Sequence, residues 1–156
     1  MELDKDFKEF IELLNEHKVK YLIIGGYAVN FHGYPRYTKD IDLWLWMSEP
    51  NIEKLIKAIK DFGFGSLHLE IEDFMTPENV IQLGYEPYRI DLLMDVDGVS
   101  FEDCYERRTE AELDGTEVKF LSLQDLIVAK KKAGRLQDLA DAEQLEKLEK
   151  KKRKKK

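Results

Sequence analysis

Residues 21–46 have the sequence YLIIGGYAVNFHGYPRYTKDIDLWLW, and this stretch organises the rest of the chain. It opens with a short apolar run, residues 22–24, that stops at Gly25 and Gly26. Such a run is typical of a buried strand, and glycines let the backbone turn sharply and approach a ligand closely. We therefore predict a strand and then a helix that begins near Tyr27. Unpaired N–H groups and the dipole at the start of that helix would attract an anion such as a triphosphate.

The loop of residues 34–39 supplies groups that bind phosphate. Its Arg36, Thr38 and Lys39 carry a guanidinium, a hydroxyl and an ammonium group. All three groups form hydrogen bonds with phosphate oxygens. For Arg36, an ordinary salt bridge to Asp40 is an equally good interpretation.

Three aspartates form the second half of the predicted site. Asp40 and Asp42 lie two residues apart on a predicted strand, so their carboxylates share one face. Asp91 lies near the middle of an apolar run, where a charge is costly unless it is paired or bound to a metal. Repelling carboxylates favour a cation between them, and their hard oxygens suit Mg²⁺ or Mn²⁺. A structural pairing of Asp91 with Arg89 or Arg107 is the alternative.

These residues resemble the DNA polymerase β-like nucleotidyltransferase superfamily. The resemblance rests on the glycine pair before a helix, the Asp-Ile-Asp motif at residues 40–42 and the later Asp91. The sequence Gly-Gly-Tyr-Ala at residues 25–28, followed by Arg36 and Thr38, is most similar to short prokaryotic members related to AbiEii-type toxins.

A later segment, residues 126–141, is similar to the lysine-bearing helical part of that group, so the resemblance covers about residues 20–142. Without the resemblance, Lys130 is interpreted as part of a run of three lysines on a solvent-exposed helix face. Three further residues in the segment are interpreted as a salt-bridge set on a helix surface: Arg135, Asp138 and Asp141.

The resemblance implies a metal-dependent nucleotidyltransferase that moves a nucleoside monophosphate from an NTP, such as ATP, to a hydroxyl of an acceptor and releases pyrophosphate. In the family, a glycine pair cradles the triphosphate, three carboxylates hold Mg²⁺ or Mn²⁺ and catalyse the transfer, and a lysine contacts the phosphates. The matching positions here are Gly25 and Gly26, then Asp40, Asp42 and Asp91, and finally Lys130. The commonest family pattern has serine where this chain has Gly26, which removes one hydroxyl contact to phosphate.

The acceptor is left open between RNA, a protein and a small molecule. The alternative function is a catalytically silent module that binds a nucleotide or a partner, as one half of a toxin–antitoxin pair. Such a module would keep the glycines but has no need of all three carboxylates.

Length and composition favour one globular domain, residues 1–149, followed by a basic tail, residues 150–156. The chain has 156 residues, of which 43% are hydrophobic and 37% charged. No apolar run approaches the roughly 20 residues that span a bilayer, and the charged amino terminus is unlike a signal peptide. We therefore expect a cytoplasmic protein without a membrane partner. The tail is interpreted as a frayed continuation of the last helix, with an electrostatic arm for an RNA acceptor as the alternative.

Hydrophobic periodicity predicts an α+β fold, a mixed β-sheet flanked by helices. Further strands are predicted over residues 67–71, 80–83, 88–94 and in a hairpin of residues 110–113 and 116–121. Further helices are predicted over residues 7–17, 52–59, 101–107, from 122 past 130, and 136–148.

Overall fold

The structure, a computed structural model, describes residues 2–85 and 88–154. Six strands form one sheet in the order β3-β4-β2-β1-β6-β5. β2 runs antiparallel to β1 and parallel to β4, so the sheet is mixed. The strands are β1 (Tyr21–Ile24), β2 (Ile41–Leu45), β3 (Val80–Leu83), β4 (Ile90–Leu93), β5 (Thr109–Leu113) and β6 (Thr116–Phe120).

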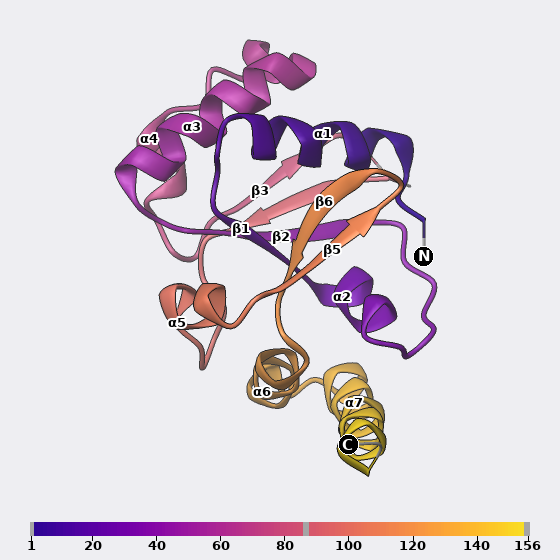
Figure 1. Cartoon of the computed structure of the whole chain (residues 1–156). Coiled ribbons are helices and arrows are strands. Elements are labelled where there is room, and N and C mark those ends of the chain that lie inside the picture. Colours follow the sequence, from indigo (N-terminus) through magenta and orange to yellow (C-terminus); the bar gives the residue numbers. More distant parts are fainter. Residues whose placement is uncertain (1, 86–87, 155–156) are drawn as a thin grey trace.

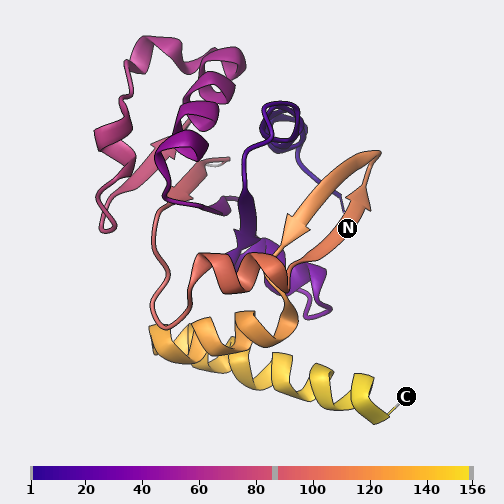
Figure 2. The same ribbon diagram turned by 60° about the vertical axis from the view of Figure 1, so that its left-hand side comes forward.

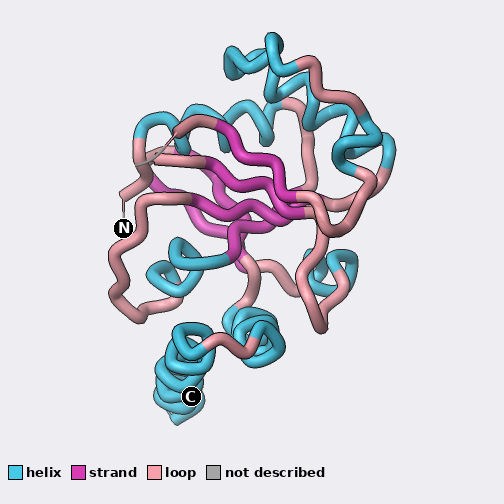
Figure 3. Tube along the Cα trace, turned by 180° about the vertical axis from the view of Figure 1, so that it is seen from behind, coloured by secondary structure: helices cyan, strands magenta, loops and turns pink. Residues whose placement is uncertain are grey.

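Helices cover both faces of the sheet (Figure 1), and the view from behind shows the strands between them (Figure 3). One face carries α1 (Lys5–Glu16), α3 (Glu49–Ile59) and α4 (Ile71–Phe74). The other carries α2 (Gly25–Phe31), α5 (Phe101–Glu106), α6 (Leu123–Ala133) and α7 (Leu136–Lys154). The predicted α+β class, a mixed sheet flanked by helices, is confirmed.

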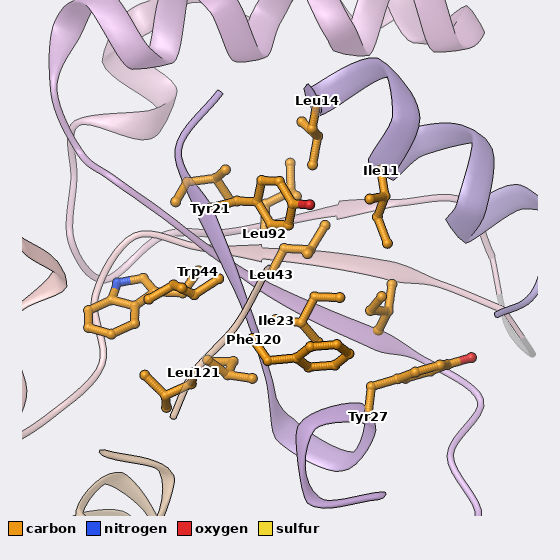
Figure 4. Close-up of a cluster of buried hydrophobic side chains, with 14 of the residues drawn as sticks. Ile11, Leu14, Tyr21, Ile23, Tyr27, Leu43, Trp44, Leu92, Phe120 and Leu121 are labelled. Carbon is orange, nitrogen blue, oxygen red and sulfur yellow. The ribbon is translucent and has the colours of Figure 1, made fainter. Parts of the chain in front are cut away.

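The core under α1 fixes the central strands in place. Figure 4 shows Ile11 and Leu14 of α1 above Leu43 of β2, and all three are buried. Trp44, the next residue of β2, packs on the opposite face against α5. Because side chains alternate along a strand, Asp42 shares the face of Trp44 and points toward α2 and α6 rather than into the core under α1.

The strand predicted over residues 67–71 is wrong. A 3-10 turn, η2 (Gly65–Leu67), ends at His68 in the left-handed conformation, and α4 begins shortly after it. The side chain of Asp73 accepts a hydrogen bond from the backbone N–H of Glu70 at 2.9 Å, which completes a capping box. These local hydrogen bonds favour the start of a helix over a strand.

The hairpin predicted at Asp114 and Gly115 is confirmed, since both residues have positive φ angles, 50° and 80°, and join β5 to β6. The helix α7 continues through Lys154, so the described part of the basic tail extends the last helix. Pro87, expected in the turn before β4, lies outside the described residues. Across the described ranges, we find no helix whose length and apolar character would let it span a bilayer.

Candidate active site

The three predicted carboxylates meet at one end of the central strands. In the parallel pairing of β2 with β4, Asp42 lies directly beside Asp91. In the antiparallel pairing of β2 with β1, Asp42 lies beside Ile24, the last residue before the glycine pair. Asp40 precedes β2 by one residue. The strand register therefore places the aspartates next to one another and next to Gly25.

Asp42 is the electrostatically strained member of this group. Burial raises its pKa to about 6, and the neighbouring charges of Asp91 and Asp40 act in the same direction. Lys130 and Arg89 oppose the shift but do not cancel it. Within residues 2–85 and 88–154, the Asp42 carboxylate receives neither a hydrogen bond nor an ion pair. Asp42 is thus a partly buried carboxylate that a bound cation would stabilise.

Arg89 neutralises the other two carboxylates. Its Nε and Nη2 donate to the two oxygens of Asp91 at 2.7 and 3.1 Å. Nη2 also lies 3.4 Å from Oδ2 of Asp40, whose Oδ1 accepts from the backbone N–H of Arg89 at 3.1 Å. Of the two pairings considered for Asp91, the structure therefore has the one with Arg89, and sequence reasoning did not foresee that Asp40 would share it.

The glycine pair leaves room for the side chains of the site. Gly25 has a φ of +69°, and a Cβ atom there would lie 2.3 Å from Oδ2 of Asp42. A Cβ atom on Gly26 would lie 3.0 Å from Oγ1 of Thr38. The helix that follows, α2, begins at Gly25 rather than near Tyr27 and spans only seven residues. The absence of side chains at Gly25 and Gly26 therefore leaves space for the side chains of Asp42 and Thr38, whether or not a ligand is bound.

An ionic cluster built around two buried aspartates, Asp138 and Asp141, lies beside the predicted carboxylates. Arg36 donates to Asp141 of α7, which is fully buried. Lys130 of α6 lies 3.1 Å from Oδ2 of Asp141 and 3.3 Å from Oδ1 of Asp138. Arg135 donates to Asp138 at 2.7 Å. The expected salt bridge from Arg36 to Asp40 is wrong, because the loop directs Arg36 toward α7 instead.

The interpretation of Asp138 and Asp141 as part of a surface set is also wrong, since both are buried. Burial alone would raise the pKa of Asp138, but the hydrogen bonds and charges of Arg135 and Lys130 outweigh it and hold that pKa below its usual range. A helical spacing could have revealed these residues, because Asp138, Asp141 and the buried Leu145 recur at the spacing of one buried helix face.

Two cavities open beside Asp42, and that residue lines both. The α6 cavity, about 320 Å³, is bounded by the sheet end, the loop after β4 and α6, and Gly25 and Lys130 line it. The loop cavity, about 460 Å³, lies under the loop before β2. Its lining includes the other predicted site residues, Gly26, Arg36, Thr38, Asp40 and Asp91. The α6 cavity also has two acidic residues that sequence reasoning missed, Asp95 and Asp97.

A divalent cation fits part of this arrangement. Asp40 and Asp42 offer hard carboxylate oxygens of the kind that Mg²⁺ and Mn²⁺ prefer, and the raised pKa of Asp42 marks the place where positive charge is lacking. In the part of the chain that the structure describes, no group of three or more Asp, Glu, His or Cys side chains is arranged as a metal site. A metal held also by Asp91 would share that carboxylate with Arg89.

Solved structures with the same fold support the placement of these elements. The lincosamide antibiotic adenylyltransferase LnuA, solved with lincomycin bound, has a TM-score of 0.60 and 19% identity, over 94% of this chain and 98% of that one. A candidate nucleotidyltransferase from Thermotoga maritima, TM1012, has a TM-score of 0.59 and 18% identity, over 93% of this chain and 91% of that one.

An antigenic nucleotidyltransferase-like protein from Paracoccidioides brasiliensis has a TM-score of 0.51 and 18% identity, over 95% of this chain and 78% of that one. A search of curated protein sequences finds no match to the chain. The family model described as a nucleotidyl transferase of unknown function, DUF2204, matches residues 4–156. The chain therefore belongs to this nucleotidyl transferase family.

Proposed function

We propose that the protein transfers a nucleoside monophosphate from an NTP to a hydroxyl group of an acceptor and releases pyrophosphate. One observation carries the proposal. All eight residues proposed from the sequence, although distant along the chain, line two cavities that share Asp42. Membership of the nucleotidyl transferase family supports the same reaction.

The residues have distinct proposed roles. Arg36, Thr38 and Lys130 bind the triphosphate, together with the backbone at the glycine pair. Asp91 accepts the proton of the acceptor hydroxyl, whose oxygen then forms a bond to the α-phosphorus while the bond to the leaving pyrophosphate breaks. Arg36 and Lys130 offset the negative charge that develops on the leaving group. When bound at Asp40 and Asp42, Mg²⁺ or Mn²⁺ would neutralise triphosphate charge and lower the pKa of the acceptor hydroxyl.

The NTP and the acceptor are proposed only as chemical classes. LnuA is an adenylyltransferase with lincomycin bound, so ATP and a small hydroxylated molecule make the first pair to test, ahead of RNA and a protein acceptor. We infer a cytoplasmic location, where NTPs and Mg²⁺ are both available. The relation to AbiEii-type toxins is kept as a proposal within the same family.

A silent nucleotide-binding or partner-binding module is the second candidate function, and the pairing of Arg89 with Asp91 and Asp40 favours it. In such a module the arginine would permanently neutralise the two carboxylates. A role as one half of a toxin–antitoxin pair is compatible with either function and would give a stable complex with a partner protein.

The first experiment is thermal unfolding with ATP, GTP, CTP and UTP, with and without Mg²⁺ or Mn²⁺. Because a ligand that binds only the folded state raises the melting temperature, we expect a metal-dependent increase for at least one NTP. Asp42→Ala should abolish the increase, whereas Asp103→Ala, at an exposed position on α5, should not. An increase that persists in Asp42→Ala would remove Asp42 from the site.

Pyrophosphate release distinguishes the two candidate functions. A nucleotidyltransferase should release pyrophosphate when the bound NTP is offered small hydroxylated acceptors, RNA and protein in turn. Binding of an NTP without release from any of them would favour the silent module.

A further inference from the structure

Asp141 has an unusual set of partners for a residue on the last helix. Its side chain is fully buried, and it accepts hydrogen bonds or ion pairs from Arg36 in the loop before β2, Lys130 on α6 and Gln137 on its own helix. Figure 2 shows α6 and α7 side by side below the sheet. One carboxylate therefore joins three segments of the chain.

Stability alone gives a weak reason for this arrangement. A buried ion pair loses the hydration of both partners, and replacing it with apolar side chains is often neutral or stabilising. The pair of Arg107 with Asp125 shows how the same fold uses a buried aspartate elsewhere, with two hydrogen bonds of 2.9 and 3.1 Å to a single arginine. Asp141 differs because its two cations line the two cavities beside Asp42.

The geometry of the cations also points to a ligand. The Arg36 side chain keeps 32% of its surface exposed while its Nη1 is held by Asp141, so its other donors are available in the loop cavity. The Lys130 side chain is only 11% exposed, and its ammonium group forms ion pairs with Asp141 and Asp138. Both long side chains are thus fixed before any ligand arrives, which reduces the conformational entropy lost when they bind phosphate.

We propose that Asp141 is a positioning residue for the NTP: its carboxylate, whose Oδ2 contacts both Arg36 and Lys130, holds these cations in the two cavities that share Asp42, where they contact the phosphates. The inference rests on the proposed function. It assigns to α7 a part in nucleotide binding, although Asp141 itself contacts no phosphate.

The test compares Asp141→Asn with Asp125→Asn, a control that breaks the pair of another buried aspartate with the half-exposed Arg107, away from both cavities. We expect the KM and Kd for the NTP to rise about tenfold or more in Asp141→Asn, together with a smaller fall in kcat, because Arg36 and Lys130 also offset charge on the leaving group. Asp125→Asn should lose stability without this increase. An unchanged or lower Kd in Asp141→Asn would overturn the inference, and a lower Kd would show that Asp141 competes with phosphate for the cations.

A double-mutant cycle gives a readout that a purely structural role would not change. If Asp141 acts through Arg36, then Arg36→Gln and Asp141→Asn should each weaken NTP binding, and the double variant should be little weaker than either single variant. Fully additive effects on Kd would contradict the proposal.

A milder variant covers the case in which Asp141→Asn does not fold. Gln137 is exposed and donates to Oδ1 of Asp141 at 2.9 Å, so Gln137→Ala should loosen the carboxylate and raise the Kd by about two- to fivefold. No change in this variant would then count against the inference. If the wild-type protein binds no NTP, the proposed function and this inference both fail, whereas binding that is insensitive to Asp141 removes this inference alone.

Discussion

Asp42 shows how a residue of a candidate site can oppose the stability of its own fold. Its pKa rises from 3.8 to about 6, first through burial and then through Asp91 and Asp40. Between about pH 4 and pH 6, Asp42 is therefore protonated in the folded protein but ionised in the unfolded chain. The ionised carboxylate destabilises the folded state, an effect that is absent below about pH 4 and complete above about pH 6.

Asp42→Asn should therefore stabilise the free protein at pH 8, by about 1 to 3 kcal/mol. The gain should shrink as the pH falls from about 6 to about 4, because wild-type Asp42 becomes protonated over that range. Denaturant unfolding of the wild type and of Asp42→Asn at several pH values measures this gain in stability. The same variant should lose metal-dependent NTP binding. A pH-independent change in stability would show that the charge of Asp42 is not the cause.

Gly25→Ala tests the close approach at the glycine pair. A Cβ atom at Gly25 would lie 2.3 Å from Oδ2 of Asp42, and the φ of +69° disfavours any side chain. Gly115 has a similar φ of +80° but nothing within 4 Å of its Cβ position, so Gly115→Ala isolates the cost of the backbone conformation.

We expect Gly115→Ala to cost about 1 to 2 kcal/mol and to leave NTP binding unchanged. Gly25→Ala should cost more and should weaken NTP binding, because Asp42 has to move. Chemical denaturation and NTP titration of both variants check this. Equal losses of stability in the two variants, with NTP binding intact in both, would mean that the Asp42 side chain can move away from residue 25 at little cost in free energy.

The residues of the candidate site were predictable to the extent that local patterns encode them. The glycine pair, the Asp-Ile-Asp motif and the isolated Asp91 stand out from their neighbours, and the structure brings them together. The partners of these residues were not predictable in the same way. Arg36 and Asp141 are separated by 105 positions, and only the packing of α7 against the loop decides that they meet. The catalytic and binding roles remain proposals.

At the level of the elements, α6 and α7 fix the place of one residue selected from the sequence and explain one error of prediction. Lys130 was chosen by resemblance, and it lines the α6 cavity. The spacing of Asp138 and Asp141 from Arg135 predicts a salt-bridge set on a helix surface, but both aspartates are buried. They are buried because α7 turns the face with Leu145 toward α6 and the loop before β2, and the cations there compensate their charge.

The wrong strand at residues 67–71 has a different origin. Alternating apolar and polar residues satisfied the pattern of a half-exposed strand, but a strand needs a neighbour with which to pair. The sheet ends at β3. Residues 67–71 run from the end of a 3-10 turn through irregular backbone to the first residue of α4, which is stabilised by its own capping box. Alternation over five residues predicts a strand poorly when local hydrogen bonds can replace the sheet.

For the whole molecule, charge is unevenly distributed between the body and the carboxyl-terminal end. The chain has a formal net charge of −7, and all seven residues from 150 to 156 are basic. The described part of this segment is exposed, so it contributes charge rather than packing to the fold. We propose that residues 1–149 are a domain that is stable without the tail.

Deletion of residues 150–156 should change the melting temperature by less than about 2 °C, since exposed residues contribute little to stability. The formal net charge then changes from −7 to −14. Repulsion of an anionic nucleotide should slow its association by about two- to fivefold at low salt and much less at high salt. Stopped-flow binding at two ionic strengths measures this. A large fall in melting temperature would show that the tail belongs to the domain.

The strand order also determines when the site can assemble during folding. Strands β1 to β4 adjoin one another, but β1 must also pair with β6 through Ile23 and Phe120, which come from opposite ends of the chain. Contacts between distant segments form slowly because a long loop must close first. The helices that carry Lys130 and Asp141 follow β6 in the chain and therefore leave the ribosome after it. A nascent chain can therefore bring the three aspartates together well before the α6 cavity beside them is complete.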